Sequence, residues 1–90
     1  MVRLVTAADT LIELYRAVVL AVLTSDTRHA WKRERIIRVL TIHKLVDLPV
    51  NVPVLRLALG DLIRRGDIAR VTDGWYRAQW PPAEDGPGQR

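Results

Sequence analysis

Arginine is the residue whose number and placement most clearly indicate a chemistry in this chain. The 90 residues contain twelve Arg and two Lys against seven Asp and three Glu, which gives a net charge of +4. Residues 28–48 carry a net charge of +4 and residues 49–80 carry +2. Because guanidinium groups bind phosphate and carboxylate oxygens, a basic excess in the middle of the chain is expected if one face meets a polyanion. The alternative is a solvated basic surface without a partner.

Residues for catalysis or metal binding are scarce. The chain has no Cys, and His29 and His43 lie apart without acidic or Cys neighbours in a metal-ligand pattern. Neither a paired-carboxylate motif nor a Gly-rich phosphate loop is present, and the few Ser and Thr hydroxyls suit caps and turns. We therefore expect a protein that is not an enzyme and that needs no cofactor and no metal.

The apolar segments are short. The longest apolar run covers residues 17–23, whereas a membrane-spanning helix needs about 20 residues. No basic start followed by an apolar stretch and a small-residue cleavage site is present. The sequence therefore predicts an intracellular, cytoplasmic protein (nucleoid-associated in a prokaryote) that does not enter membranes.

Two apolar stripes mark the first expected helix, which Thr6 is predicted to cap and which continues to residue 24. The first stripe comprises Leu11, Leu14, Tyr15, Val18 and Val22. The second stripe, about 100° away on the helical wheel, comprises Ile12, Val19, Leu20 and Leu23. Because a short domain has one core to face, the second stripe predicts a homodimer interface. The alternative is that a neighbouring helix of the same chain covers both stripes.

A second helix is expected from residue 28 to residue 40, preceded by the capping residues Ser25, Asp26 and Thr27. Its apolar face consists of Ala30, Ile36, Ile37 and Leu40. Its basic face consists of Arg28, Lys32, Arg35 and Arg38, with Trp31 among them. Beyond Thr41 the apolar positions move to the other side, which predicts a break and a short helix over residues 42–48. The alternative is a single helix over residues 28–48.

A third helix and a hairpin follow. Pro53 suits the first turn of a helix that Gly66 ends. The expected buried stripe consists of Leu55, Ala58, Leu59 and Leu62. Asp73-Gly74 between alternating residues predicts a two-residue hairpin turn. The corresponding register pairs Thr72 with Trp75, Val71 with Tyr76, Arg70 with Arg77, and Ala69 with Ala78.

The segment LRLALGDLIRRGDI, followed by DGWYRA, resembles the second helix and the wing of winged helix-turn-helix domains. With its extra first helix, the chain is similar to dimeric regulators of the multiple-antibiotic-resistance type and to small archaeal viral regulators. The resemblance covers residues 35–78, and the short connection between the first two helices of the motif leaves almost no room for the family's usual first strand.

The resemblance implies an α+β winged helix-turn-helix fold with an extra N-terminal helix and a C-terminal β-hairpin wing. Residues 1–80 would form this single domain, with a dimerisation helix over 1–24 and the helix-turn-helix plus wing over 25–80. Residues 81–90 contain three Pro and two Gly and almost no apolar residue, so we expect a disordered tail there. Trp80 is expected to close the core before this tail.

In this family the helix after the turn enters the major groove and the wing reaches the DNA backbone or minor groove. Opposite its buried stripe, the third helix presents Arg56, Leu57, Gly60, Asp61 and Arg64. It has no exposed Asn, Gln, Ser or Thr to read adenine, so we expect phosphate and shape recognition rather than tight base readout. Gly60 would allow a partner to approach closely.

Arg70 and Arg77 of the wing are expected to face each other. Like charges that lie directly opposite destabilise a hairpin by up to about 1 kcal/mol. This repulsion favours an anion, such as a DNA phosphate, between them. Trp75 either enters a groove of the DNA or caps the hairpin. The complete set of expected DNA-binding residues is Arg28, Lys32, Arg35, Arg56, Arg64, Arg70, Trp75 and Arg77.

The sequence thus predicts double-stranded DNA binding, by a homodimeric transcriptional regulator or by a DNA-organising protein. The alternative is a winged helix that binds another protein and not DNA. In that case Leu57 and Val54 would dock the partner, and the arginines would serve solubility.

Overall fold

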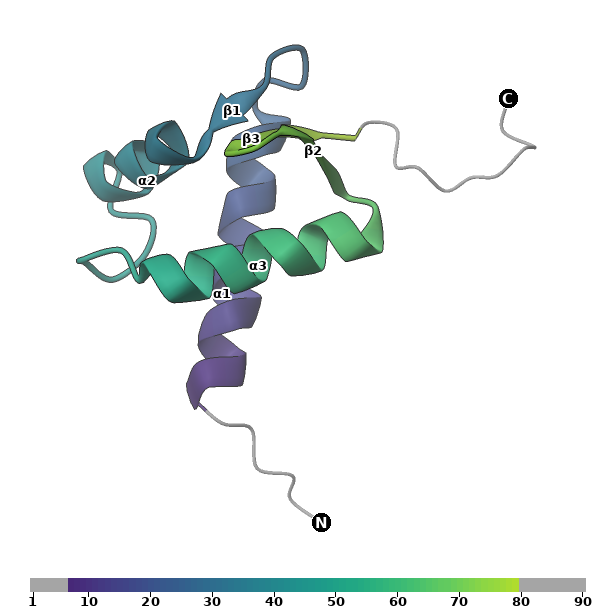
Figure 1. The fold of residues 1–90 in the computed structure, drawn as a ribbon. Coiled ribbons are helices and arrows are strands. Elements are labelled where there is room, and N and C mark those ends of the chain that lie inside the picture. The colour runs from purple at the N-terminus through teal and green to yellow at the C-terminus, as the bar shows by residue number, and fades with distance from the viewer. Residues whose placement is uncertain (1–6, 80–90) are drawn as a thin grey trace.

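The computed structural model describes residues 7–79, which form three helices and a small antiparallel sheet (Figure 1). The elements are α1 (Ala7–Thr24), β1 (Trp31–Lys32), α2 (Arg33–Ile42), α3 (Val52–Arg65), β2 (Ile68–Thr72) and β3 (Trp75–Ala78). The central strand β3 pairs with both β1 and β2. The predicted α+β class is therefore confirmed at this level. The predictions on Thr6, Trp80 and residues 81–90 lie outside the described residues.

The core lies where α1 crosses α3 below the sheet (Figure 1). The largest fully buried side chains are Tyr15, Val19 and Leu23 of α1, Ile36 and Leu40 of α2, Leu55, Leu59 and Leu62 of α3, and Ile68 of β2. Each contributes about 1.5–3 kcal/mol through burial. The Tyr15 hydroxyl accepts the backbone N–H of Asn51 at 2.8 Å, which ties α1 to the start of α3. None of the helices within residues 7–79 combines the length and apolarity needed to cross a membrane.

The predicted dimer interface on α1 is wrong for two of its four residues. Val19 and Leu23 are completely buried inside this single chain. The reason is that α1 contacts α3, β3 and α2 together, so one core covers side chains from both apolar stripes. This is the alternative in which the chain itself covers both stripes. Ile12 and Leu20 remain only partly buried.

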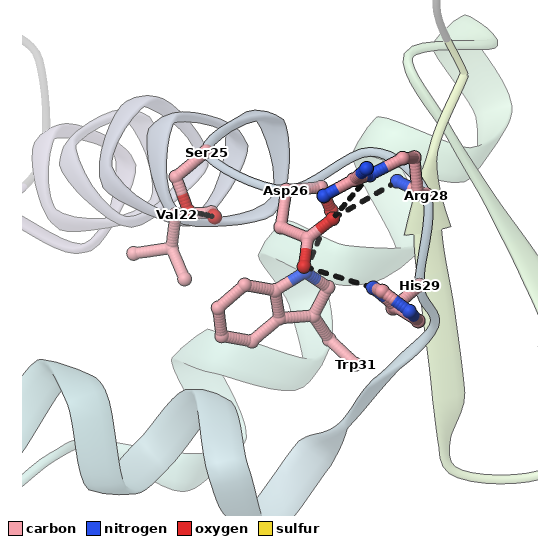
Figure 2. A network of polar contacts seen from close by, with 6 residues as sticks. All are labelled: Val22, Ser25, Asp26, Arg28, His29 and Trp31. Atoms are coloured by element: carbon pink, nitrogen blue, oxygen red, sulfur yellow. Dashed lines mark hydrogen bonds and ion pairs between the residues drawn. The ribbon is translucent and has the colours of Figure 1, made fainter.

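The segment between α1 and α2 differs from the prediction, because α2 begins at Arg33 and not at residue 28. Figure 2 shows the turn that takes the place of the expected first helical turns. Ser25 caps the end of α1 by donating to the carbonyl of Val22 at 2.6 Å, and Asp26 accepts the backbone N–H of Arg28 at 3.1 Å. The capping residues therefore end one helix instead of starting the next.

Trp31 explains why the chain is extended at this point. The sequence placed it on an exposed basic face, but its ring is 5% exposed and its indole N–H donates to the carbonyl of Asp26 at 3.1 Å (Figure 2). Trp31 pairs with Tyr76 in the sheet. Burial of an aromatic ring in the core stabilises the fold by several kcal/mol. This free energy exceeds what one additional turn of helix would contribute.

The predicted break near Thr41 is confirmed, because α2 ends at Ile42. The predicted short helix over residues 42–48 does not form. Thr41 donates its hydroxyl back to the carbonyl of Ile37 at 2.8 Å instead of capping a new helix, and Lys44 adopts a φ of 51°. The region 28–48 thus contains one helix, preceded by a strand and followed by a loop.

Helix α3 follows the prediction closely. Asn51 caps it by accepting the N–H of Val54 at 3.1 Å, Pro53 lies in its first turn, and Gly66 ends it with a φ of 82°. The residues buried on α3 are the four predicted ones, Leu55, Ala58, Leu59 and Leu62. Local signals suffice here because each cap is made by residues of the helix ends themselves.

The hairpin has the predicted turn but a different register beyond it. Thr72 pairs with Trp75, after which a bulge at Val71 shifts the pairing. The observed pairs are Arg70 with Tyr76, Ala69 with Arg77, and Ile68 with Ala78. Directly paired residues share one face of a sheet, so the predicted register would have turned Ile68 away from the core. The bulge instead buries Ile68 completely.

Arg70 and Arg77 consequently do not face each other, and the predicted repulsion between them is wrong. Arg70 pairs with the buried Tyr76 and so lies on the sheet face that is directed towards α3. Arg77 pairs with Ala69 and lies on the opposite face. The two arginines of the hairpin therefore point to different surroundings, which makes them a matched pair for experiments.

Candidate functional site

A basic groove lies between the start of α2, the outer face of α3 and the β2–β3 hairpin. Its inner pocket has a volume of 240 Å³ and is lined by Arg33, Arg56, Leu59, Gly60, Ile63, Arg70, Asp73, Gly74 and Tyr76. Its outer pocket has a volume of 410 Å³ and is lined by Lys32, Arg33, Glu34, Arg56, Asp73, Gly74 and Trp75. The two pockets share Arg33, Arg56 and the hairpin turn, and so form one continuous surface.

The charges of the basic groove are four cations and two carboxylates: Lys32, Arg33, Arg56 and Arg70 against Glu34 and Asp73. Within residues 7–79, none of the six takes part in an ion pair. The Lys32 ammonium lies 6.0 Å from the centre of the Trp75 ring. Four cations against two carboxylates leave the lining of the groove with a net charge of +2, which attracts an anion.

Each wall of the groove is fixed by backbone structure. The N–H of Arg33 donates to the carbonyl of Gly74 at 2.9 Å, which joins the start of α2 to the hairpin turn. On α3, Arg56, Gly60 and Ile63 recur at helical spacing and so share one face. The bulge at Val71 directs Arg70 to the same side. The four cations therefore lie on four elements, β1, α2, α3 and β2, of which β1 and β2 both pair with β3.

Four of the predicted DNA-binding residues meet in this groove: Lys32, Arg56, Arg70 and Trp75. Sequence reasoning missed Arg33, which becomes the first residue of α2 once Trp31 and Lys32 are recognised as a strand. No local signal marks Arg33, because two residues of a strand cannot be told from a helix by their pattern. The β-branched and aromatic enrichment that usually marks a strand is too short here to be seen.

The other four predicted residues lie elsewhere. Arg28 lies 3.9 Å from Asp26 in the turn after α1, and the Arg35 guanidinium stacks 4.4 Å from the centre of the Trp31 ring. Arg64 is paired with Asp61, and Arg77 lies on the outer face of the hairpin. The structure therefore does not bring these four into the basic groove.

Asp61 has a structural partner that the sequence did not suggest. It accepts a hydrogen bond from Arg16 of α1 at 2.9 Å and also binds Arg64. Arg16 and Asp61 are both partly buried, and this ion pair joins α1 to α3. Asp61 is the one acidic residue of α3, and both of its ion-pair partners lie outside the basic groove.

Asp26, in the turn after α1, is hydrogen-bonded to residues of the same turn (Figure 2). A hydrogen bond to His29 at 3.0 Å, together with the N–H of Arg28, holds the pKa of the Asp26 carboxyl below its ordinary value. Both hydrogen bonds favour the charged form. Within residues 7–79 no group of three potential metal ligands exists. The hydrogen bond between Asp26 and His29 stabilises the turn after α1.

No known protein family, curated protein or solved structure matches this chain.

Proposed function

We propose that the protein is a winged helix-turn-helix domain that binds double-stranded DNA through the basic groove, as a transcriptional regulator or a DNA-organising protein. The observation that carries the proposal is the group of four cations between α2, α3 and the hairpin, none of which forms an ion pair within residues 7–79. The element order of helix, strand, helix, helix, strand, strand supports it, since it is the order of a winged helix. The short strand β1 lies between α1 and α2.

In this proposal α3 is the recognition helix and the β2–β3 hairpin is the wing. Arg56 is exposed on α3 beside Gly60, where the missing side chain allows a phosphate chain to approach. Leu57 is 57% exposed and suits a thymine methyl group. Cationic side chains outnumber the uncharged polar side chains that could hydrogen-bond to base edges. The binding free energy therefore comes mainly from phosphate contacts and depends little on the DNA sequence.

The salt dependence of binding tests the proposal. Four cations on phosphates predict a slope of log affinity against log salt between about −3 and −4 for each protein chain. Fluorescence anisotropy with a labelled duplex, from 50 mM to 300 mM salt, measures it. A slope near zero would refute DNA binding. Discrimination above about 10⁵ between one site and random duplex would refute the phosphate-dominated mode.

A matched pair on the hairpin tests the groove itself. Arg70→Gln should weaken duplex binding about 8-fold at 0.1 M salt and reduce the slope by about 0.9, because one phosphate contact is lost. Arg77→Gln removes the same charge from the opposite face and should leave both quantities nearly unchanged. Equal losses in the two variants would show that net charge, and not the groove, governs binding.

Gly60→Ala separates stability from binding. The added methyl group would lie 3.5 Å from the Arg64 Nη1 atom, an ordinary contact, so it fits the folded chain. Alanine raises helix stability by about 1 kcal/mol relative to glycine. We expect thermal unfolding to move to a higher temperature while affinity for duplex DNA falls, since the methyl group protrudes into the groove. A variant that is stabilised and binds with undiminished affinity would contradict close approach at Gly60.

The proposal includes a homodimer, but the basic groove is complete in one chain. Ile12 and Leu20 are the members of the predicted interface that remain partly exposed. Ile12→Glu should shift a dimer to a monomer by light scattering without loss of helix content. A wild-type protein that is monomeric at high micromolar concentration would remove the dimer from the proposal and leave the groove unaffected.

The exposed Leu57, with the half-buried Val54 beside it on α3, supports a second candidate function. A protein partner would bury these apolar side chains and leave the groove cations in water. In that case duplex binding would be absent in the anisotropy experiment, and Leu57→Ser would abolish the protein complex while Arg70→Gln would not.

A further inference from the structure

The hydroxyl of Tyr76 lacks a hydrogen-bond partner within residues 7–79, and the proposed contact of the groove with DNA does not by itself explain this. It lines the inner pocket and is 7% exposed, and its hydroxyl forms no hydrogen bond to any residue between 7 and 79. Because Tyr76 lines the pocket, its hydroxyl can donate a hydrogen bond to water or to a ligand there. A ligand that accepts a hydrogen bond inside the pocket would satisfy it.

We propose that the inner pocket is a binding site for one tetrahedral oxyanion, a phosphate group held by Arg33, Arg56, Arg70 and the Tyr76 hydroxyl. The inference rests on the proposed function in taking a backbone phosphodiester of DNA as the ligand. A free phosphate has the same chemistry, so the experiment below separates the two sources. The site would make one phosphate position dominate the docking of the duplex.

The donors approach the pocket from four different elements. Arg33 comes from α2, Arg56 from α3, Arg70 from β2 and Tyr76 from β3. Donors that converge from several sides match a tetrahedral anion better than a planar carboxylate, which two parallel N–H groups of one arginine already satisfy. Arg33 is also the first residue of a ten-residue helix, whose positive end favours an anion at this position.

The inner pocket has room for a phosphate group. Its volume of 240 Å³ greatly exceeds the roughly 30 Å³ share of one water, so a phosphate group fits with some water left. Leu59 and Ile63 lie behind the charged side chains on the α3 side of the pocket. Asp73 is the one carboxylate on the pocket wall, and three guanidinium groups outweigh its charge.

Tyr76→Phe is the decisive variant because it removes a hydrogen bond without changing any charge. Amide chemical shifts are followed while inorganic phosphate replaces chloride at constant ionic strength. The wild-type protein should show saturable binding of one phosphate, and Tyr76→Phe should bind it about 3- to 10-fold more weakly. Arg70→Gln should lose binding, and Arg77→Gln should behave as wild type. A linear, unsaturated response, or equal affinities of wild type and Tyr76→Phe, would overturn the inference.

Duplex DNA binding by the same variants distinguishes a backbone phosphodiester of DNA from a free phosphate as the ligand. Tyr76→Phe should weaken duplex binding with an unchanged salt slope, because the slope counts cations and none is lost. If duplex DNA binds but Tyr76→Phe has no effect and phosphate does not saturate, the proposed function stands and the oxyanion site is refuted. If phosphate saturates and the duplex does not bind, the site stands with a free phosphate group as its ligand, and the DNA function is refuted. Thermal unfolding of Tyr76→Phe at or above the wild-type temperature verifies the fold.

Discussion

Replacing Arg33, Arg56 and Arg70 together by Gln should reduce the affinity for duplex DNA about 500-fold at 0.1 M salt. Each phosphate contact contributes about 0.9 to the salt slope, which corresponds to about 8-fold in affinity at this salt concentration, and three contacts are lost. The slope itself should fall by about 2.7. The three side chains form no ion pairs within residues 7–79, so thermal stability should stay within about 0.5 kcal/mol for each substitution, and relief of repulsion should move it upwards.

The matched control neutralises Arg38, Arg65 and Arg77 instead. These arginines also lack ion pairs in the described part of the chain, are exposed, and do not line the groove. The control carries the same net charge as the groove variant, and we expect it to bind duplex DNA within a few-fold of wild type. Comparable losses in the two triple variants would mean that the protein attracts DNA through its overall charge, and the groove would then have no special role.

The parts of the fold that could be predicted from the sequence are those set by neighbours in the chain. The cap at Asn51 and Pro53, the end of α3 at Gly66 and the turn at Asp73-Gly74 are each decided within a few residues. The buried stripe of α3 follows from helical spacing alone. For the same reason Arg56 could be assigned to the exposed face of that helix.

The parts that could not be predicted depend on distant residues. The bulge at Val71 exists because Ile68 must reach a core built largely by α1 and α3. β1 exists because Trp31 pairs with Tyr76, 45 residues later in the chain. A helical pattern and a strand of two residues cannot be told apart locally, and here tertiary burial decides between them.

These two distant effects also decide the candidate site. Without the bulge, Arg70 would share a face with Arg77, and without β1, Arg33 would lie in the second turn of a longer helix. Arg64 illustrates the reverse case, because its acidic neighbour Asp61 is also bound by Arg16 of α1. The sequence could therefore predict a basic surface and its location in the middle of the chain, but not which arginines converge.

Trp31→Ala should destabilise the protein by about 3–5 kcal/mol, since it empties a large buried site and removes the hydrogen bond to Asp26. For a domain of this size, the unfolding temperature should fall by about 15–30 °C. The helix expected over residues 28–40 leads to the opposite result, because Trp31 would then be exposed and alanine, the best helix former, would change stability by less than about 0.5 kcal/mol. Thermal unfolding followed by circular dichroism separates the two outcomes.

Arg35→Ala is the control for this experiment, because it removes the guanidinium stacked on Trp31 and leaves the ring in place. An exposed cation–π contact contributes about 0.5–1 kcal/mol, so the unfolding temperature should change by only a few degrees. A Trp31→Ala variant that unfolds within a few degrees of wild type would show that β1 is not formed. Lys32 and Arg33 follow Trp31 directly, and Arg33 reaches the groove because β1 holds the start of α2 against the hairpin. The loss of β1 would therefore also remove one wall of the basic groove.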